Sequence, residues 1–152
     1  MAKKTDQSKT KIIKKNISGS ENIESNNLII IGEILTGIGL IIFWILFFTV
    51  GMIDKNVAPD CYFQYEHAFP PADIILALGL IFSSILLLKK LPIGKTVALV
   101  CAGALIFLGL LDFSFNLQNK VYLISMAEAI SNGFINAWCV CFGLVIFIKF
   151  RN

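Results

Sequence analysis

Polar side chains able to carry charge or move protons are concentrated in one stretch of an otherwise apolar sequence, residues 112–136. Carboxylates there can hold a cation or exchange a proton, and carboxamides can orient a polar ligand. Ionisable groups are costly inside apolar segments and mark functional sites there. The sequence therefore predicts a binding site whose residues are Asp112, Asn116, Glu128, Asn132 and Asn136.

The spacing of these residues puts them on two helical faces. Asp112 and Asn116 are four residues apart and share one face of a helix. Glu128, Asn132 and Asn136 share a face of the next helix, and Asn136 lies roughly 12 Å along the axis from Glu128. Polar faces in hydrocarbon turn toward each other or toward a water-filled cavity. We therefore predict an outward-opening polar pocket between these two helices.

Three more residues are predicted as outer contributors to this site: Asp73, Glu66 and His67. Asp73 also has a purely structural interpretation, because a carboxylate in the first turn of a helix is stabilised by the helix dipole. Glu66 and His67 are adjacent, and the chain has no second His, so the pattern lacks the ligand spacing of a zinc site. The sequence predicts no metal, no cofactor and no catalytic set.

Two carboxylates in one pocket would repel each other if both were ionised. One of them would then hold its proton near neutral pH, which suits a proton-coupled site. The alternative is that the carboxylates and carboxamides form hydrogen bonds between helices, typically worth about 0.6–2 kcal/mol each, and bind nothing else.

The composition shows what kind of scaffold must position these groups. Apolar residues make up 57% and charged residues 15% of the 152 residues, and the mean hydropathy is +0.78. Continuous apolar runs of this length indicate membrane helices instead of barrel strands. We predict an all-α polytopic membrane protein, a bundle of four transmembrane helices. The predicted spans are 28–51, 71–89, 94–115 and 123–149, with an external loop over 52–70.

The distribution of positive charge predicts the orientation. Lys and Arg are retained on the cytoplasmic side of a membrane. Six Lys residues precede the first span, Lys89, Lys90 and Lys95 lie where the second span turns into the third, and Lys149 with Arg151 lies at the end of the fourth. Both termini are therefore predicted to be cytoplasmic, in a cell-membrane protein. The net charge of +3 reflects this topology and not nucleic-acid binding.

The chain divides into two parts. Residues 1–27 are rich in Lys, Ser and Asn, and too few of them are apolar to offset the entropy of ordering. We predict a disordered basic tail there and a transmembrane domain over 28–152. In the first span, Gly32, Thr36 and Gly39 form a strip of small residues that another helix can approach closely.

Glu33, the one charged residue within the first span, has two interpretations. It is a functional candidate because it is ionisable. It is also close enough to the cytoplasmic edge to be structural. Its position resembles that of the substrate- and proton-binding Glu of small multidrug transporters, although the long aromatic loop 52–70 is foreign to that family.

A second resemblance concerns Asp73. The Ala72-Asp73 pair is similar to the second aspartate motif of lipoprotein signal peptidases, which are also four-span proteins. Pro71 stands where that motif has Asn, and Asp112 is followed by Phe113 where the family has Arg. Each resemblance covers only a few residues, and the sequence assigns no family.

Three functional hypotheses follow. The first is binding or proton-coupled transport of a small polar or cationic solute, with Asp112 and Glu128 carrying the charge. The second is a non-catalytic accessory or assembly subunit of a membrane complex. The third is a membrane-embedded hydrolase using Asp73 and Asp112 as an acid–base pair. The expected partners are the lipid bilayer, a small polar or cationic solute, and further copies of the chain or a larger membrane complex.

Overall fold

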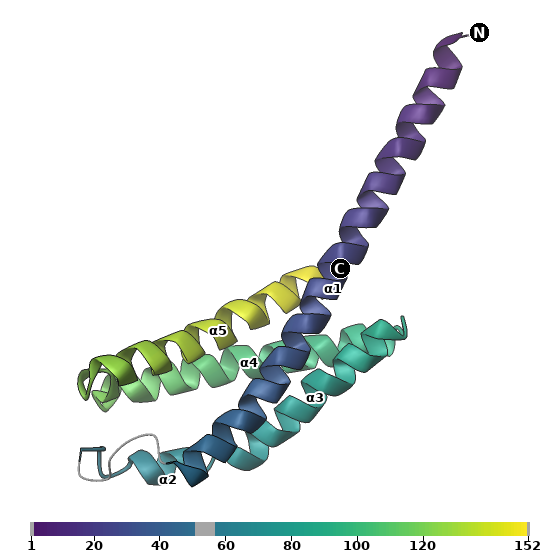
Figure 1. Cartoon of the computed structure of the whole chain (residues 1–152). Coiled ribbons are helices and arrows are strands. Elements are labelled where there is room, and N and C mark those ends of the chain that lie inside the picture. Colours follow the sequence, from purple (N-terminus) through teal and green to yellow (C-terminus); the bar gives the residue numbers. More distant parts are fainter. Residues whose placement is uncertain (1, 51–56, 152) are drawn as a thin grey trace.

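The chain is all-helical wherever its structure is described. The computed structural model describes residues 2–50 and 57–151, and their side chains from residue 26 onward. Within those ranges there is no strand. The elements are α1 (Ala2–Thr49), α2 (Tyr62–Glu66), α3 (Pro70–Leu88), α4 (Ile93–Gln118), the 3-10 helix η1 (Val121–Leu123) and α5 (Met126–Phe150) (Figure 1).

Four of these helices are long and apolar enough to cross a membrane: Asn26–Thr49 within α1, then α3, α4 and α5. Large apolar side chains such as Leu28, Ile75 and Phe107 are exposed on their outer faces. Exposed apolar area of this extent is unfavourable in water and suits lipid. The predicted all-α class is confirmed, and four helices able to span a membrane support a membrane protein.

The main difference in the spans lies at the α4–α5 connection, where the sequence predicted a helix from residue 123. Lys120 takes a left-handed backbone conformation with φ 58°, and η1 follows it. The Ser125 side chain then accepts a hydrogen bond from the backbone N–H of Glu128 at 3.1 Å and caps α5. The Ser-x-x-Glu pattern is a known helix-start signal. It explains why α5 begins at Met126.

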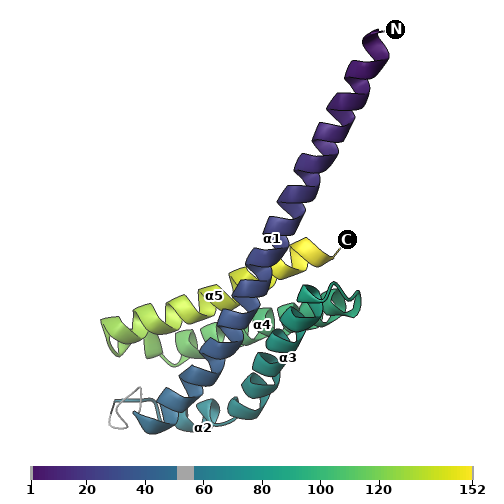
Figure 2. The same cartoon turned by 45° about the vertical axis from the view of Figure 1, so that its right-hand side comes forward.

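The N-terminal part of α1 projects away from the other helices (Figures 1 and 2). A disordered tail was predicted over residues 1–27, whereas α1 is continuous from Ala2. The transmembrane domain thus begins within a longer helix. Lys55, predicted to be external, lies outside the described residues.

The helices pack as two pairs. α1 packs along α3 and α4 along α5, and α3 contacts α4. Consecutive spans that are joined by a short connection are adjacent: α3 lies next to α4, and α4 lies next to α5. The two pairs meet near the turn between α3 and α4 and diverge toward the end that carries α2 (Figures 1 and 2).

Contacts between α1 and α5 join the two helix pairs in the region where the pairs have not yet diverged. A Cβ atom at Gly32 would lie 2.5 Å from the Phe142 ring, so this ring covers the glycine. The Trp138 indole N–H donates to the Thr36 hydroxyl at 3.1 Å. Gly39, further along the same strip, has no atom within 4 Å of its ideal Cβ position. The small-residue strip is therefore covered by α5 at one end and open at the other.

Candidate functional site

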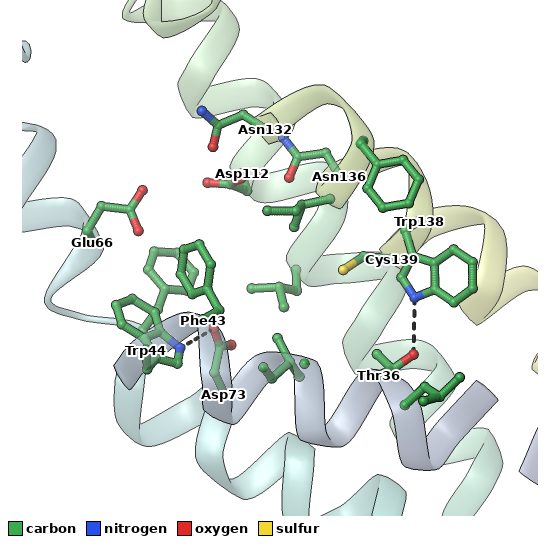
Figure 3. A pocket seen from close by; sticks show the side chains of 17 residues that line it. Thr36, Phe43, Trp44, Glu66, Asp73, Asp112, Asn132, Asn136, Trp138 and Cys139 are labelled. Atoms are coloured by element: carbon green, nitrogen blue, oxygen red, sulfur yellow. Dashed lines mark hydrogen bonds between the residues drawn. The ribbon is translucent and has the colours of Figure 1, made fainter. Parts of the chain in front are cut away.

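A cavity of about 340 Å³ occupies the divergence between the two helix pairs (Figure 3). Residues of α1, α3, α4 and α5, together with the end of α2, contribute to its wall. Much of the wall is apolar. Its apolar and aromatic side chains are Leu35, Leu40, Phe43, Trp44, Phe69, Leu108, Phe134, Ile135 and Trp138.

Three carboxylates lie on this one cavity: Glu66, Asp73 and Asp112. Glu66 ends α2, Asp73 lies in the first turn of α3, and Asp112 lies near the C-terminal end of α4. Figure 3 shows the Glu66 and Asp112 carboxylates pointing toward each other across the cavity. Of the described residues that line it, none is Lys, Arg or His. The cavity is therefore strongly acidic at this end.

Carboxamides hold Asp112 in place. The Asn116 side chain donates to Asp112 Oδ2 at 3.1 Å, and the Asn136 side chain also hydrogen-bonds to this carboxylate. Asn136 in addition donates to the Tyr122 hydroxyl at 2.8 Å. α4 and α5 are thus joined by polar contacts beside the cavity, as the predicted polar faces implied. The Asp112 carboxylate still faces the cavity.

Asp73 is fixed by α1. Its Oδ2 accepts a hydrogen bond from the Trp44 indole N–H at 3.0 Å, and both side chains are buried (Figure 3). The sequence gives two interpretations for Asp73, an outer contributor to the site and a structural carboxylate in the first helical turn. The structure adds a contact between them that joins α1 to the start of α3.

Glu66 is only 8% exposed, although it lies on a short helix outside the spans. Burial, followed by the nearby Asp112 and Asp73 carboxylates, raises its pKa to about 8, against the lowering effect of a hydrogen bond from Tyr62. Burial and the same acidic surroundings also raise the pKa of the Tyr62 and Tyr65 hydroxyls. Glu66 is therefore a group that exchanges a proton near neutral pH.

The Tyr65 side chain lies near the three carboxylates of this acidic end. Its ring stacks on Phe115 of α4, with centroids 3.6 Å apart and planes 2° apart. Its hydroxyl oxygen is buried and makes no hydrogen bond to the protein. A buried hydroxyl without a protein partner leaves a donor free for water or a ligand.

Five of the eight predicted site residues line the cavity: Asp112, Asn132, Asn136, Asp73 and Glu66. The other three do not. Asn116 is buried behind Asp112. Glu128 lies on the flank of α5 and accepts a hydrogen bond from Asn132 at 3.0 Å. His67 is exposed, packs against Phe47 and Phe48, and contacts the Phe63 carbonyl through Nδ1.

Four residues that were not predicted also line the cavity: Thr36, Phe43, Trp138 and Cys139. Their types are ordinary in a membrane core. One signal was available for Thr36, because it belongs to the small-residue strip of α1. A strip of small residues can line an open cavity as well as allow a close contact with a neighbouring helix.

The carboxylates are too widely spread to form a metal centre. Within residues 26–50 and 57–151, no three His, Cys, Asp or Glu side chains are grouped so that they could hold a metal ion.

Comparison with protein-family models, curated proteins and solved structures finds no match for this chain. The chemistry of the cavity is therefore the basis for assigning a function.

Proposed function

We propose that the cavity binds an organic cation that has an apolar part, such as an amine attached to an aromatic or aliphatic group. The observation that carries this proposal is the meeting of three carboxylates, without a basic lining residue, at one end of an apolar wall. The carboxylates supply the charge complement for the ammonium group. The wall, with Phe43, Phe134 and Trp138, supplies the apolar complement and faces suited to cation–π contact.

The size of the cavity supports a small organic ligand. Its volume of about 340 Å³ lies at the lower end of the range for ligand pockets, which hold mainly apolar contacts and a few placed polar groups. Asn132 and Asn136 are the placed polar groups on α5. They can accept hydrogen bonds from an ammonium group through their carbonyl oxygens.

Binding is coupled to a proton in this proposal. A cation entering the acidic end favours the ionised form of Glu66, whose pKa lies near 8, and so displaces its proton at neutral pH. Exchange of a proton for a cation at one site is the basis of proton-coupled transport. We propose this exchange as the role of Glu66.

A matched set of probes tests the proposal. We expect purified full-length protein to bind phenethylammonium more tightly than phenethyl alcohol, which keeps the ring and removes the charge. Ethylammonium keeps the charge and removes the ring, and it should also bind more weakly. Isothermal titration in detergent or nanodiscs measures all three. Equal affinity for phenethylammonium and phenethyl alcohol would refute a cation site.

The two other hypotheses stay predictions. The hydrolase hypothesis gains one favourable observation, because Asp73 and Asp112 lie on the same cavity. Against it, Asp73 already accepts the Trp44 N–H, which holds this carboxylate toward α1. An accessory role would use the same polar contacts between α4 and α5 without any ligand.

We further propose that the protein lies in the cell membrane with both termini in the cytoplasm, from the charge distribution described above. Cys61 provides the test because it is exposed on the loop side, where its thiol contacts Asn119 Oδ1 at 3.4 Å. An impermeant maleimide should label Cys61 in intact cells, and Cys61→Ser should abolish the labelling. Labelling that appears only after lysis would mean the opposite orientation.

A further inference from the structure

A second polar cluster lies in the interface between α1 and α3, apart from the cavity. Its centre is Glu33, which is 0% exposed. Glu33 precedes the cavity-lining Thr36 by three residues on α1 and does not itself line the cavity. The sequence left its role open between a functional and a structural carboxylate. The structure places it fully inside the protein.

Two serines of α3 hold the two carboxylate oxygens. Ser83 Oγ lies 3.1 Å from Glu33 Oε1 and 3.3 Å from the Gly94 carbonyl oxygen of α4. Ser84 Oγ lies 3.1 Å from Glu33 Oε2, and it also approaches the carbonyl oxygens of Ile30 and Leu80 at 3.3 and 2.9 Å. Both serines are 0% exposed.

The cluster has more close contacts between oxygen atoms than it has hydroxyl hydrogens to form hydrogen bonds. Ser83 and Ser84 make five contacts to oxygen acceptors, and each hydroxyl has one hydrogen to donate. The Ser84 hydrogen suits the 2.9 Å contact to Leu80, the usual bond of a helical serine to the carbonyl four residues earlier. The remaining oxygens are then drawn together without a positive group to balance them.

The balance of charge around Glu33 also favours a bound cation. A buried carboxylate within a membrane is balanced either by a proton or by a partner charge. In the part of the chain whose side chains are described, only Ser83 and Ser84 act on Glu33, and no Lys, Arg or His does. The titratable side chain facing it from α4 is the Cys101 thiol, which carries no positive charge. None of the side chains described from residue 26 onward therefore supplies a cation for this site.

We propose that Glu33, Ser83 and Ser84, with the carbonyl oxygens of Ile30 and Gly94, bind one Na⁺ ion between α1, α3 and α4. Hard cations take oxygen ligands, and backbone carbonyls coordinate Na⁺ in membrane transporters. One carboxylate balances one positive charge, whereas a divalent ion would leave a net charge buried.

The tight packing of α1 against α3 selects the smaller monovalent ion. A Cβ atom at Gly37, one turn after Glu33, would lie 2.9 Å from the Ala77 carbonyl oxygen. The two backbones therefore cannot separate easily to admit K⁺. The site joins three helices, so its occupation stabilises the folded protein by mass action.

Thermal unfolding of purified full-length protein tests this proposal. We expect the Tm to rise by several degrees, saturably, as NaCl replaces KCl at constant ionic strength. KCl is the reference salt because an organic cation would also bind in the cavity. Glu33→Gln keeps the size of the side chain and removes its charge, and it should abolish the response to Na⁺. Asp112→Asn, which changes only the cavity, should keep that response in full.

The single variants Ser83→Ala and Ser84→Ala keep the carboxylate and provide a second measurement if Glu33→Gln fails to fold. Each should raise the Na⁺ concentration needed for half of the Tm rise. Equal Tm in Na⁺ and K⁺ would overturn the proposal, as would a Na⁺ response that survives Glu33→Gln. A Tm that depends on pH through Glu33 but not on Na⁺ would also overturn it, because a proton alone would then balance the carboxylate.

Discussion

Replacing Asp112 with asparagine is expected to weaken phenethylammonium binding by about tenfold to a hundredfold, the loss typical for a hydrogen bond to a charged group in a desolvated site. Asp112 lies among the acidic groups, since both Glu66 and Asp73 are electrostatically linked to it. Asn keeps the shape of the side chain and can still accept the Asn116 hydrogen bond. The variant therefore removes charge with little change in packing.

The matched control for this variant is Glu128→Gln. It removes one negative charge from the neighbouring helix, but Glu128 does not line the cavity. Its effect on affinity should stay within about threefold, as for a screened charge outside the site. Titration calorimetry measures both affinities, and thermal unfolding without ligand checks that both variants fold. Equal losses in the two variants would indicate a general field effect and not contact with Asp112. Unchanged affinity in Asp112→Asn would move the site elsewhere.

Membrane class and the number of spans follow from the sequence because they depend on local composition. A run of apolar residues needs no knowledge of its neighbours to be identified as a span. The polar face shared by Asp112 and Asn116 is also local, and their hydrogen bond at 3.1 Å shows that the spacing was interpreted correctly. The Ser125-to-Glu128 helix cap is equally local, and the prediction overlooked it.

The shape of the cavity depends on contacts between distant residues, which spacing along the chain cannot indicate. Trp44 and Asp73 are 29 residues apart, and Thr36 and Trp138 are 102 apart. These hydrogen bonds position α1 against its neighbours and decide which side chains face the cavity. The predicted pocket lay between the helices that are now α4 and α5, with Glu66, His67 and Asp73 as outer contributors. The structure instead places α1 along one whole wall.

Helical faces also do not distinguish a residue that faces a cavity from one that faces a neighbouring helix. Asn116 and Asp112 share a face, yet Asn116 is buried behind the carboxylate and Asp112 lines the cavity. Glu66 is the last residue of the five-residue helix α2 and His67 follows it, and only Glu66 points inward. The direction of α2 decides between them, and it is set by its packing on α1 and α4.

The affinity for phenethylammonium is expected to rise with pH up to about pH 8 and to be flat above it. Glu66 has an ordinary pKa of 4.5 in water, and burial near Asp112 and Asp73 raises it to about 8 in the protein. Below that pH the cation must displace the proton of Glu66 before it can interact with the negative charge of this carboxylate. One proton displaced per cation gives at most a tenfold rise in affinity per pH unit.

The raised pKa of Glu66 also determines whether the stability of the folded protein rises or falls with pH. Between pH 4.5 and about 8 the folded protein holds a proton on Glu66 that the unfolded chain releases. Because the folded state binds more protons, its stability falls as pH rises through this window and is constant on either side. Glu66→Gln should remove this contribution, so the variant should lose less stability between about pH 5 and pH 8 than the parent protein.

Two variants separate Glu66 from the other acidic groups. Glu66→Gln should flatten the pH dependence of cation affinity between about pH 6 and pH 8, and Glu128→Gln should leave it unchanged. Tyr62→Phe removes the hydrogen bond that lowers the Glu66 pKa, so the midpoint should move above pH 8. A steep pH dependence that persists in Glu66→Gln would assign the exchanged proton to another group. A wild-type affinity that is flat across this range would mean that cation binding displaces no proton at all.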